Sequence, residues 1–390
     1  MEHKTGLEDA YVMKDNKKLR MGYTTGSCAA AASKAAVHML LLDDRVEETA
    51  LMTPKGILLH LLIEDIKAET DDDGLPVLVS CAVRKDGGDD PDVTDQALIY
   101  ATVTRQDDGI TIDGGEGVGR VTKPGLARPV GEAAINPVPL LMITQEVKKV
   151  CRECGYQEGL NVIISIPKGR ELADKTFNPR LGIEGGLSVL GTSGIVIPMS
   201  EDALISSIRL EMQTYAARGA RYLLITPGNY GETFAAHMPG LNHSTEMKCS
   251  NYVGETIDSA VELGFKGILF IAHIGKFIKV SGGIMNTHSH SADCRAELMA
   301  AAAIRAGGDA DTARRILGTF TTEEALDILE ESGADLFRKT MEQVCTRVDF
   351  YLKNRCKGRI STGAVLFSQK KGKLGETSEA PSLIRQLSKK

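Results

Sequence analysis

The stretch GIVIPMSEDALISSIRLEMQTYAARGARYLLITPGNYG, residues 194–231, decides the fold class of the C-terminal half of this 390-residue chain. It begins an alternation of β-branched strand segments with longer helical segments. The predicted strands cover residues 195–197, 222–226 and 268–271, and the predicted helices cover residues 201–218 and 253–263. Alternation of this kind is typical of a parallel sheet, so we expect a Rossmann-like, three-layer α/β domain.

The N-terminal half has a different pattern. Residues 28–42 (CAAAASKAAVHMLLL) predict a helix of strong helix formers, and short strand-like runs separated by Gly, Pro and Asp follow. A chain of this length is too long to fold around a single hydrophobic core. We therefore expect an α+β domain over residues 1–193, the Rossmann-like domain over 194–369, and a flexible Lys-rich tail over 370–390.

Composition narrows the functional classes. A net charge of −6 disfavours a nucleic-acid binder, although a locally basic site for an anionic small molecule stays open. Apolar runs long enough to span a bilayer are missing, so we expect a cytoplasmic protein without membrane contact. The eight cysteines indicate no disulfide framework. The sequence leaves a homo-oligomer open.

A glycine-rich loop, ITIDGGEGVG at residues 110–119, resembles a nucleotide-binding fingerprint. Such a fingerprint needs a helix directly after it, and the following RVTKPGLARP cannot form one. We therefore interpret the loop as one that holds carboxylates through its amides and through the cations of Arg120, Lys123 and Arg128, or as a solvated turn. A phosphotransferase that cradles phosphate at residues 114–119 is the alternative enzyme class.

A stronger nucleotide-site candidate follows the strands predicted at residues 222–226 and 268–271. Ligands of open parallel sheets bind outside the carboxyl ends of the strands, and a right-handed crossover brings both turns to one edge. Glycines there allow close approach, Tyr230 offers a stacking face, and Asn229 offers hydrogen bonds. Two turns without a ligand are the alternative. The predicted cofactor-binding residues are Gly228, Asn229, Tyr230, Gly231, His273, Gly275 and Lys276.

The segment GGIMNTHSHSAD, residues 282–293, contains His288 and His290 at a spacing that shares one face of an extended chain, with Asp293 nearby. No zinc signature includes them, so a polar lining for a ligand is the preferred interpretation, and we predict no protein-bound metal. Upstream, Thr24, Thr25 and Ser27 precede the Ala-rich helix. They either bind a carboxylate at its N-terminus or simply cap it.

Five stretches together resemble the CbiD family, the cobalt-precorrin-5B C1-methyltransferases of anaerobic cobalamin biosynthesis. The stretches are RMGYTTGSCAAAASKAA (20–36), KDGGDDPDVT (85–94), GGEGVGRVTKPGLARPVGEAAINPVPLLMI (114–143), KGRELADKTFNPRLGIEGGLSVLGTSG (168–194) and GGIMNTHSHSAD (282–293). They keep their order between residues 22 and 297. The remaining ninety residues resemble the family mainly in helical character.

The resemblance implies methyl transfer from S-adenosylmethionine to C-1 of cobalt-precorrin-5B, giving cobalt-precorrin-6A, with cobalt arriving only as part of the substrate. The strand ends described above place S-adenosylmethionine in the C-terminal domain, so we expect the N-terminal domain to be the tetrapyrrole side. His288 becomes the catalytic candidate, by polarising or deprotonating the ring periphery. A non-catalytic tetrapyrrole carrier is a further alternative. The expected substrate-binding residues are Thr24, Thr25, Ser27, Arg120, Lys123, Lys168, Arg170 and Arg180.

Overall fold

The computed structural model describes residues 3–388. The chain divides into two compact units, Met1–Glu201 and Asp202–Lys390, so the boundary lies eight residues beyond the predicted one. The reason is strand β13 (Ile195–Val196), which pairs antiparallel with β3 (Gly22–Tyr23) in the N-terminal unit. The prediction that residues 195–197 open the C-terminal sheet was therefore wrong.

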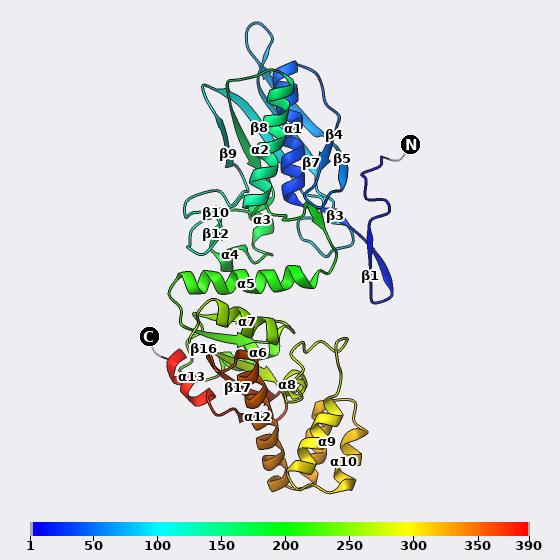
Figure 1. Cartoon of the computed structure of the whole chain (residues 1–390), viewed down its shortest axis with the longest axis vertical. Coiled ribbons are helices and arrows are strands. Elements are labelled where there is room, and N and C mark those ends of the chain that lie inside the picture. Colours follow the sequence, from blue (N-terminus) through cyan, green and yellow to red (C-terminus); the bar gives the residue numbers. More distant parts are fainter. Residues whose placement is uncertain (1–2, 389–390) are drawn as a thin grey trace. The chain divides into compact units, whose positions relative to one another are not determined.

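The N-terminal unit is built on a five-stranded mixed sheet with the order β6-β7-β8-β11-β9. All neighbours are antiparallel except β11 and β9, which run parallel. The strands are β6 (Glu64–Thr70), β7 (Pro76–Arg84), β8 (Leu98–Gln106), β9 (Ile110–Gly114) and β11 (Gly159–Ser165). Helices α1 (Thr25–Leu42) and α2 (Pro137–Glu153) lie side by side and pack against this sheet (Figure 1).

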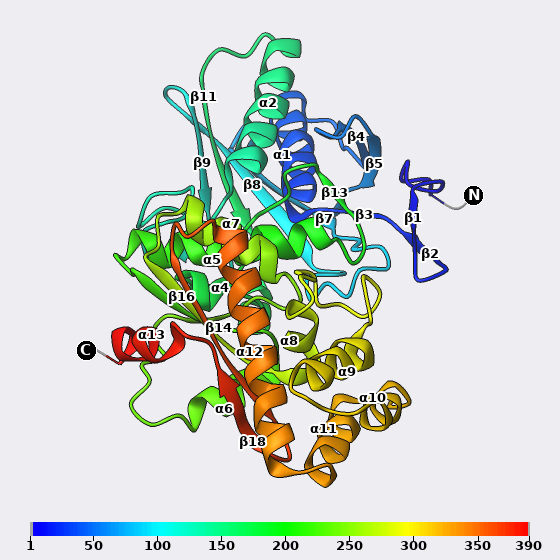
Figure 2. The same ribbon diagram turned by 60° about the horizontal axis from the view of Figure 1, so that its bottom comes forward.

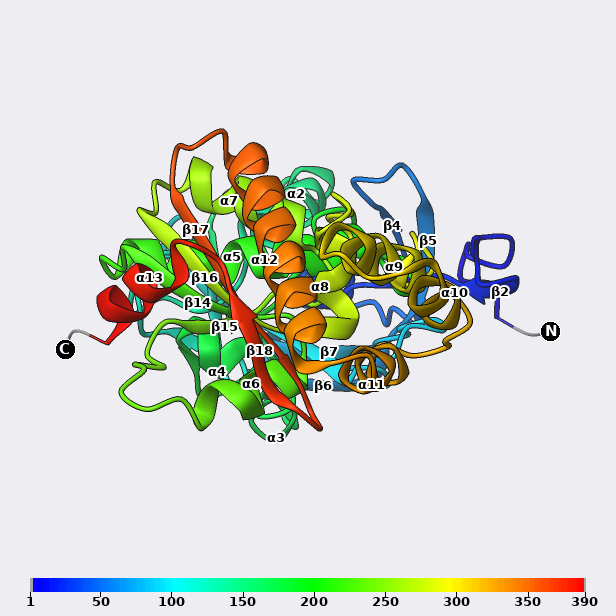
Figure 3. The same ribbon diagram turned by 90° about the horizontal axis from the view of Figure 1, so that it is seen from below.

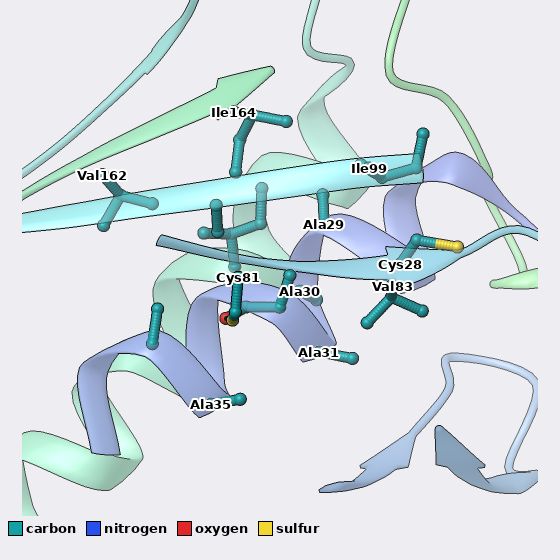
Figure 4. Packing of buried hydrophobic residues seen from close by; sticks show 14 of the residues in the cluster. Cys28, Ala29, Ala30, Ala31, Ala35, Cys81, Val83, Ile99, Val162 and Ile164 are labelled. Atoms are coloured by element: carbon teal, nitrogen blue, oxygen red, sulfur yellow. The ribbon is translucent and has the colours of Figure 1, made fainter. Parts of the chain in front are cut away.

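Helix α1 is buried along most of its length because its core-facing side chains are small. Ala29, Ala30 and Ala31 are fully buried. They belong to one hydrophobic cluster with β-branched residues of the strands, among them Val83 and Val162 (Figure 4). A run of alanines lets the helix backbone approach the sheet closely, which explains why the strongest helix-forming segment of the sequence is also the centre of this core.

Shorter elements complete the N-terminal unit. They are the hairpins β1 (Tyr11–Lys14) with β2 (Lys17–Arg20) and β4 (Glu48–Met52) with β5 (Leu58–Leu62), the strand pair β10 (Arg120–Val121) with β12 (Ile183–Glu184), and helices α3 (Gly169–Ala173) and α4 (Asn178–Leu181). The acidic stretch at residues 86–95 is an ordered loop. Within it Asp92 pairs at 2.6 Å with Lys85, whose side chain is only 2% exposed.

The C-terminal unit contains a second five-stranded sheet, in the order β15-β14-β16-β17-β18. The first four strands are parallel and β18 is antiparallel to β17. The strands are β14 (Tyr222–Thr226), β15 (Glu246–Lys248), β16 (Gly267–His273), β17 (Ser361–Ser368) and β18 (Gly372–Glu376). Together the two units form a mixed α/β architecture with one five-stranded sheet in each.

Both faces of the C-terminal sheet are covered, because alternate strand residues enter two separate cores. Ile268 and Phe270 pack in one core with helices α5, α7, α8 and α12, whereas Leu269 and Ile271 pack in the other with α6 and α13. Figure 2 shows α12 lying along the strands. The helices are α5 (Glu201–Ala217), α6 (Asn229–Ala236), α7 (Val253–Glu262), α8 (Ile274–Val280), α12 (Ala334–Cys356) and α13 (Ala380–Leu387).

Three further helices, α9 (Arg295–Arg305), α10 (Ala310–Leu317) and α11 (Thr322–Glu331), gather beside α12 (Figure 3). The chain then ends in ordered structure. The expectation of a flexible tail over residues 370–390 was wrong for residues 370–388, because β18 joins the sheet and Leu383 and Leu387 of α13 enter its core. Residues 389–390 lie outside the described part. Within residues 3–388 no helix has the length and apolarity required to cross a membrane.

Candidate functional site

The carboxyl edge of the C-terminal sheet has a topological switch point between β14 and β16. These two strands are neighbours, as predicted, although β15 comes between them in the chain. Helix α6, which follows β14, packs on one face of the sheet, and α8, which follows β16, packs on the other. The two connections therefore diverge at this point, which is where open α/β sheets bind their ligands.

The turn after β14 is shaped by two glycines. Gly228 has a φ of 107°, a conformation that other residues rarely adopt, and it precedes α6 without a side-chain cap. At Gly231 a Cβ atom would lie 2.6 Å from the carbonyl oxygen of Ile271. The turn therefore approaches β16 more closely than a larger residue would allow. Among the described residues no side chain caps the start of α6.

Lysines flank this turn on both sides. The Nζ atom of Lys276 donates to the carbonyl oxygen of Ser250 at 3.3 Å and lies 3.6 Å from the point that a Cβ atom at Gly228 would occupy. Burial lowers the pKa of Lys276. On the other side Lys248 donates to Oδ1 of Asn229 at 2.9 Å and pairs with Glu232 at 2.7 Å. Lys248 was missed in the sequence because the short strand β15 was not recognised.

His273 fixes the turn after β16. Its Nδ1 accepts the N–H of Gly275 at 3.1 Å, and its Nε2 lies 3.3 Å from Oε1 of Glu323 on α11. Burial lowers the pKa of His273, and the neighbouring Glu323 opposes this shift. Ser368, at the end of β17, donates its hydroxyl to the same carboxylate at 2.7 Å. His273 is therefore a neutral cap for α8. Glu323 of α11, fifty residues later in the chain, holds the ring in place.

The segment that carries His288 is tied to the same edge. Thr287 donates its N–H to the carbonyl oxygen of Asn251 at 2.9 Å, and Asn251 directly follows Ser250, the partner of Lys276. In addition, Nζ of the buried Lys279 donates a hydrogen bond to the carbonyl oxygen of Thr287 at 3.1 Å. The backbone next to His288 is thus fixed from two sides.

The imidazole of His288 is exposed and has a defined orientation. Its Nδ1 accepts the N–H of His290 at 3.2 Å, so the proton of the neutral ring lies on Nε2. Asp293 forms a two-pronged ion pair with Arg295 at 2.7 and 2.8 Å rather than facing the histidines. Among residues 3–388 no three His, Cys, Asp or Glu side chains lie close enough together to hold a metal ion.

In the N-terminal unit the three hydroxyls at the start of α1 are engaged by the protein itself. Thr24 caps the helix by accepting the N–H of Ser27 at 3.2 Å, and Ser27 donates to the carbonyl oxygen of Gly194 at 2.7 Å. Thr25 exchanges two hydrogen bonds with the backbone of Leu190. Thr24 is therefore the helix cap, and Thr25 and Ser27 hold the backbone of residues 190–194 against the helix start.

The glycine-rich loop at residues 114–119 is a packing element. At Gly117 a Cβ atom would lie 1.8 Å from the carbonyl oxygen of Ile166, and at Gly186 it would lie 2.1 Å from that of Gly117. The amides of Gly115 and Gly119 donate to protein carbonyls at 2.8 Å. Its glycines therefore allow backbone segments to touch, and these two amides already have partners.

The predicted basic residues divide into paired and unpaired groups. Arg120 forms a two-pronged ion pair with Asp113 at 2.8 Å, and Arg128 pairs with Glu132. In the described part of the N-terminal unit, the remaining predicted cations have no ion pair, and three of the four are exposed; these residues are Lys123, Lys168, Arg170 and Arg180. They come from α3, α4 and the segment after β10, which lie together at one end of the unit in Figure 1.

Comparisons with known proteins give a consistent result. The family model CbiD matches residues 12–198, and the model CbiD, C-terminal domain, matches residues 286–378. Proteins named cobalt-precorrin-5B C(1)-methyltransferase are 46% identical in Ruminiclostridium cellulolyticum, covering 98% of both chains, and in Alkaliphilus metalliredigens, covering 97% of this chain and 98% of the relative. A crystal structure of the cobalamin biosynthesis protein cbiD from Archaeoglobus fulgidus is 27% identical, covers 74% of this chain and 87% of that one, and gives a TM-score of 0.40.

Proposed function

The chain belongs to the CbiD family, and we propose that it methylates C-1 of cobalt-precorrin-5B to give cobalt-precorrin-6A, with S-adenosylmethionine as methyl donor. The observation that carries the reaction is the 46% identity, across 98% of both chains, to a methyltransferase of that name. A phosphotransferase is disfavoured because amides of the glycine-rich loop already bind protein carbonyls. A carrier without catalysis has no comparable support among the relatives.

We further propose that the C-terminal unit is Rossmann-like and that it binds the donor at the β14–β16 switch point. Four parallel strands with helices on both faces support this interpretation. The glycines of the β14 turn offer a close approach to backbone, and the exposed ring of Tyr230 offers a stacking face for adenine.

Individual groups at this edge suit the parts of the donor. Lys276 supplies a cation, and the uncapped start of α6 supplies N–H groups, for the carboxylate of the methionine part. Asn229 accepts from Lys248 through Oδ1, so its amide NH₂ is available to an acceptor on adenine or ribose. His273 and Gly275 then act by holding the position of the turn that carries Lys276.

For the tetrapyrrole we propose the unpaired cations of the N-terminal unit as partners of its acetate and propionate groups. Lys123, Lys168, Arg170 and Arg180 are available without breaking an ion pair, and Arg is suited to two-pronged carboxylate binding. Arg120 would have to leave Asp113. Thr24, Thr25 and Ser27 contribute through the shape of the helix start, because their hydroxyls are engaged by backbone.

Methyl transfer from a sulfonium to a ring carbon depends above all on alignment, and holding two reactants in line supplies a large part of the rate enhancement. The donor supplies the methyl group. The chain's part is to hold both molecules and to exclude misaligned encounters. His288 would contribute by donating its Nε2–H to the ring periphery, because its Nδ1 is occupied by the N–H of His290.

The deciding experiment incubates the purified chain with cobalt-precorrin-5B and S-adenosylmethionine labelled in the methyl group. The expected result is one labelled methyl at C-1. Tight binding of ATP without binding of S-adenosylhomocysteine would instead favour the phosphotransferase, and binding of the tetrapyrrole without label transfer would favour the carrier.

A further inference from the structure

Phe320 is the most exposed large apolar side chain in residues 3–388, at 88%. It lies between α10 and α11, and Leu317, at the end of α10, is 51% exposed. Single exposed apolar residues are common on protein surfaces, but an almost fully exposed phenylalanine keeps a large apolar ring in water. The segment that carries Phe320 lies near the carboxyl edge of the sheet, where the candidate donor site is.

The backbone at Phe320 is held rigidly. Its N–H donates to Oε2 of Glu324 at 2.9 Å, and the N–H of Thr321 donates to the same oxygen at 3.2 Å. In return the hydroxyl of Thr321 accepts the N–H of Glu324, which completes a capping box. The ring is therefore presented to solvent by a fixed helix start rather than by a loose loop.

This helix start lies against the candidate donor site. The hydroxyl of Thr322 is 3.4 Å from the point that a Cβ atom at Gly275 would occupy. Glu323 faces His273 at 3.3 Å and accepts from Ser368 at the end of β17. The ring of Tyr230 also lies 6.1 Å from that of His273, centre to centre. Phe320 precedes Thr322 by two residues, so its backbone lies close to the turn after β16.

We infer that Phe320 contacts the methyl acceptor and supports the apolar face of the cobalt tetrapyrrole beside the donor site. This inference rests on the proposed function. Two exposed apolar side chains offer far too little area for a stable second protein, which needs roughly 800 Å² on each partner. A flat small molecule is of a size that one phenylalanine ring can support.

The position along the edge favours the acceptor over the donor. The donor candidates follow β14 and β16, whereas α11 lies beside the end of β17, two strand spacings or about 10 Å from β14. C-1 is a peripheral carbon, so the rest of the macrocycle must extend sideways once C-1 meets the donor. Towards β15 the edge is occupied by the charged group of Lys248, Asn229 and Glu232. Towards β17 the edge meets the start of α11, two residues after Phe320.

The experiment compares the full-length wild-type chain with Phe320→Ala, Phe320→Tyr and the matched control Phe350→Ala, which removes a 49% exposed phenylalanine from α12. Binding of cobalt-precorrin-5B is followed by absorbance titration, its KM and kcat by methyl transfer, and binding of S-adenosylhomocysteine by calorimetry. We expect Phe320→Ala to raise the Kd and KM for the tetrapyrrole about tenfold while the Kd for S-adenosylhomocysteine stays within about twofold. Phe320→Tyr should restore both values, and Phe350→Ala should match wild type.

An unchanged Kd and KM for the tetrapyrrole in Phe320→Ala would overturn the inference, as would an equal loss in Phe350→Ala. A loss of S-adenosylhomocysteine binding with normal tetrapyrrole binding would assign Phe320 to the donor and also overturn it. Failure of the proposed function is distinguishable, because the wild-type chain would then transfer no methyl group. The tetrapyrrole titration requires no turnover and tests Phe320 in that case too.

Discussion

Nε2 of His273 lies 3.3 Å from Oε1 of Glu323, while Nδ1 of the same ring accepts the N–H of Gly275. The pair joins the end of β16 to the first turn of α11 and holds the start of α8, the helix that carries Lys276. Burial lowers the pKa of His273 below its ordinary 6.5, and Glu323 limits that shift. The neutral ring is therefore the form that the folded chain favours.

A pH dependence of stability follows from this pair. The unfolded chain takes up a proton on His273 near pH 6.5, whereas the folded chain does so only at lower pH. The free energy of unfolding should therefore fall as the pH drops below about 6.5 and level off below the folded pKa. Urea unfolding between pH 5 and pH 8 measures this effect. His273→Asn keeps an acceptor for the N–H of Gly275 without titrating, so its stability should depend less on pH than that of wild type; equal slopes would contradict the assignment.

Much of the fold could be predicted from the sequence, because the hydrophobic pattern of a long segment indicates whether it forms a helix or a strand. Strand β14 has the predicted bounds, and α5 and α7 begin at the predicted residues and end one residue earlier than predicted. The errors come from tertiary partners. Strand β13 was assigned to the wrong unit because its partner β3 lies more than 170 residues earlier. In the same way the tail, whose Lys-rich composition suggested a loose segment, is ordered by leucines that enter the core of the second sheet.

The candidate site shows the same division. The two turns of the switch point were predicted from strand ends and glycines, and β14 and β16 are indeed neighbours. Glu323 and Lys248 were missed because their roles depend on contacts across 50 and 19 residues, which no local pattern encodes. The burial of Lys85 beside Asp92 likewise depends on tertiary packing.

Lys276 should contribute to donor affinity. Replacing it by Met removes the cation beside Gly228 while keeping most of the side-chain volume, so the Kd for S-adenosylhomocysteine should rise about tenfold, as expected for loss of one charge-assisted hydrogen bond. Lys276→Arg should retain part of the affinity. Calorimetry measures both, with Lys266→Met as a control that removes an exposed lysine at the amino end of β16, the opposite end of that strand from Lys276. Wild-type affinity in Lys276→Met would remove this residue from the donor site.

The packing role of the glycine-rich loop is tested by two alanine substitutions. Gly117 and Gly131 both have positive φ values, 69° and 92°, but only Gly117 faces a backbone oxygen at an impossible 1.8 Å. Gly117→Ala should lower the free energy of unfolding by about 3 kcal/mol, whereas Gly131→Ala should cost only the backbone strain of about 1 kcal/mol. Chemical denaturation separates the two values. Equal costs would show that close packing is not what the loop requires.

The ion pair of Lys85 and Asp92 should be important for the stability of the N-terminal unit. Removing a fully buried partner leaves a carboxylate that is largely enclosed, so Lys85→Met should cost about 3 kcal/mol of unfolding free energy. Lys67→Met removes a lysine of similar size from an exposed pair with Asp65 and should change stability little. Thermal and urea unfolding provide the comparison, and a cost in Lys85→Met no larger than in Lys67→Met would show that the pair stabilises nothing.

The orientation of His288 predicts which replacement preserves its contribution to turnover. Because Nδ1 accepts the N–H of His290, the group presented to a substrate is the Nε2–H donor. The side-chain amide of Gln can place an N–H near the position of Nε2, whereas the shorter Asn places its amide near Nδ1. If His288 polarises the ring periphery, His288→Gln should keep more of kcat than His288→Asn or His288→Ala, with donor affinity unchanged in all three. If it removes a proton instead, all three variants should lose kcat alike, because an amide cannot act as a base at neutral pH. Full turnover in His288→Ala with a normal KM would show that His288 neither polarises the ring periphery nor removes a proton from it. The rate enhancement would then come from alignment of the two reactants alone.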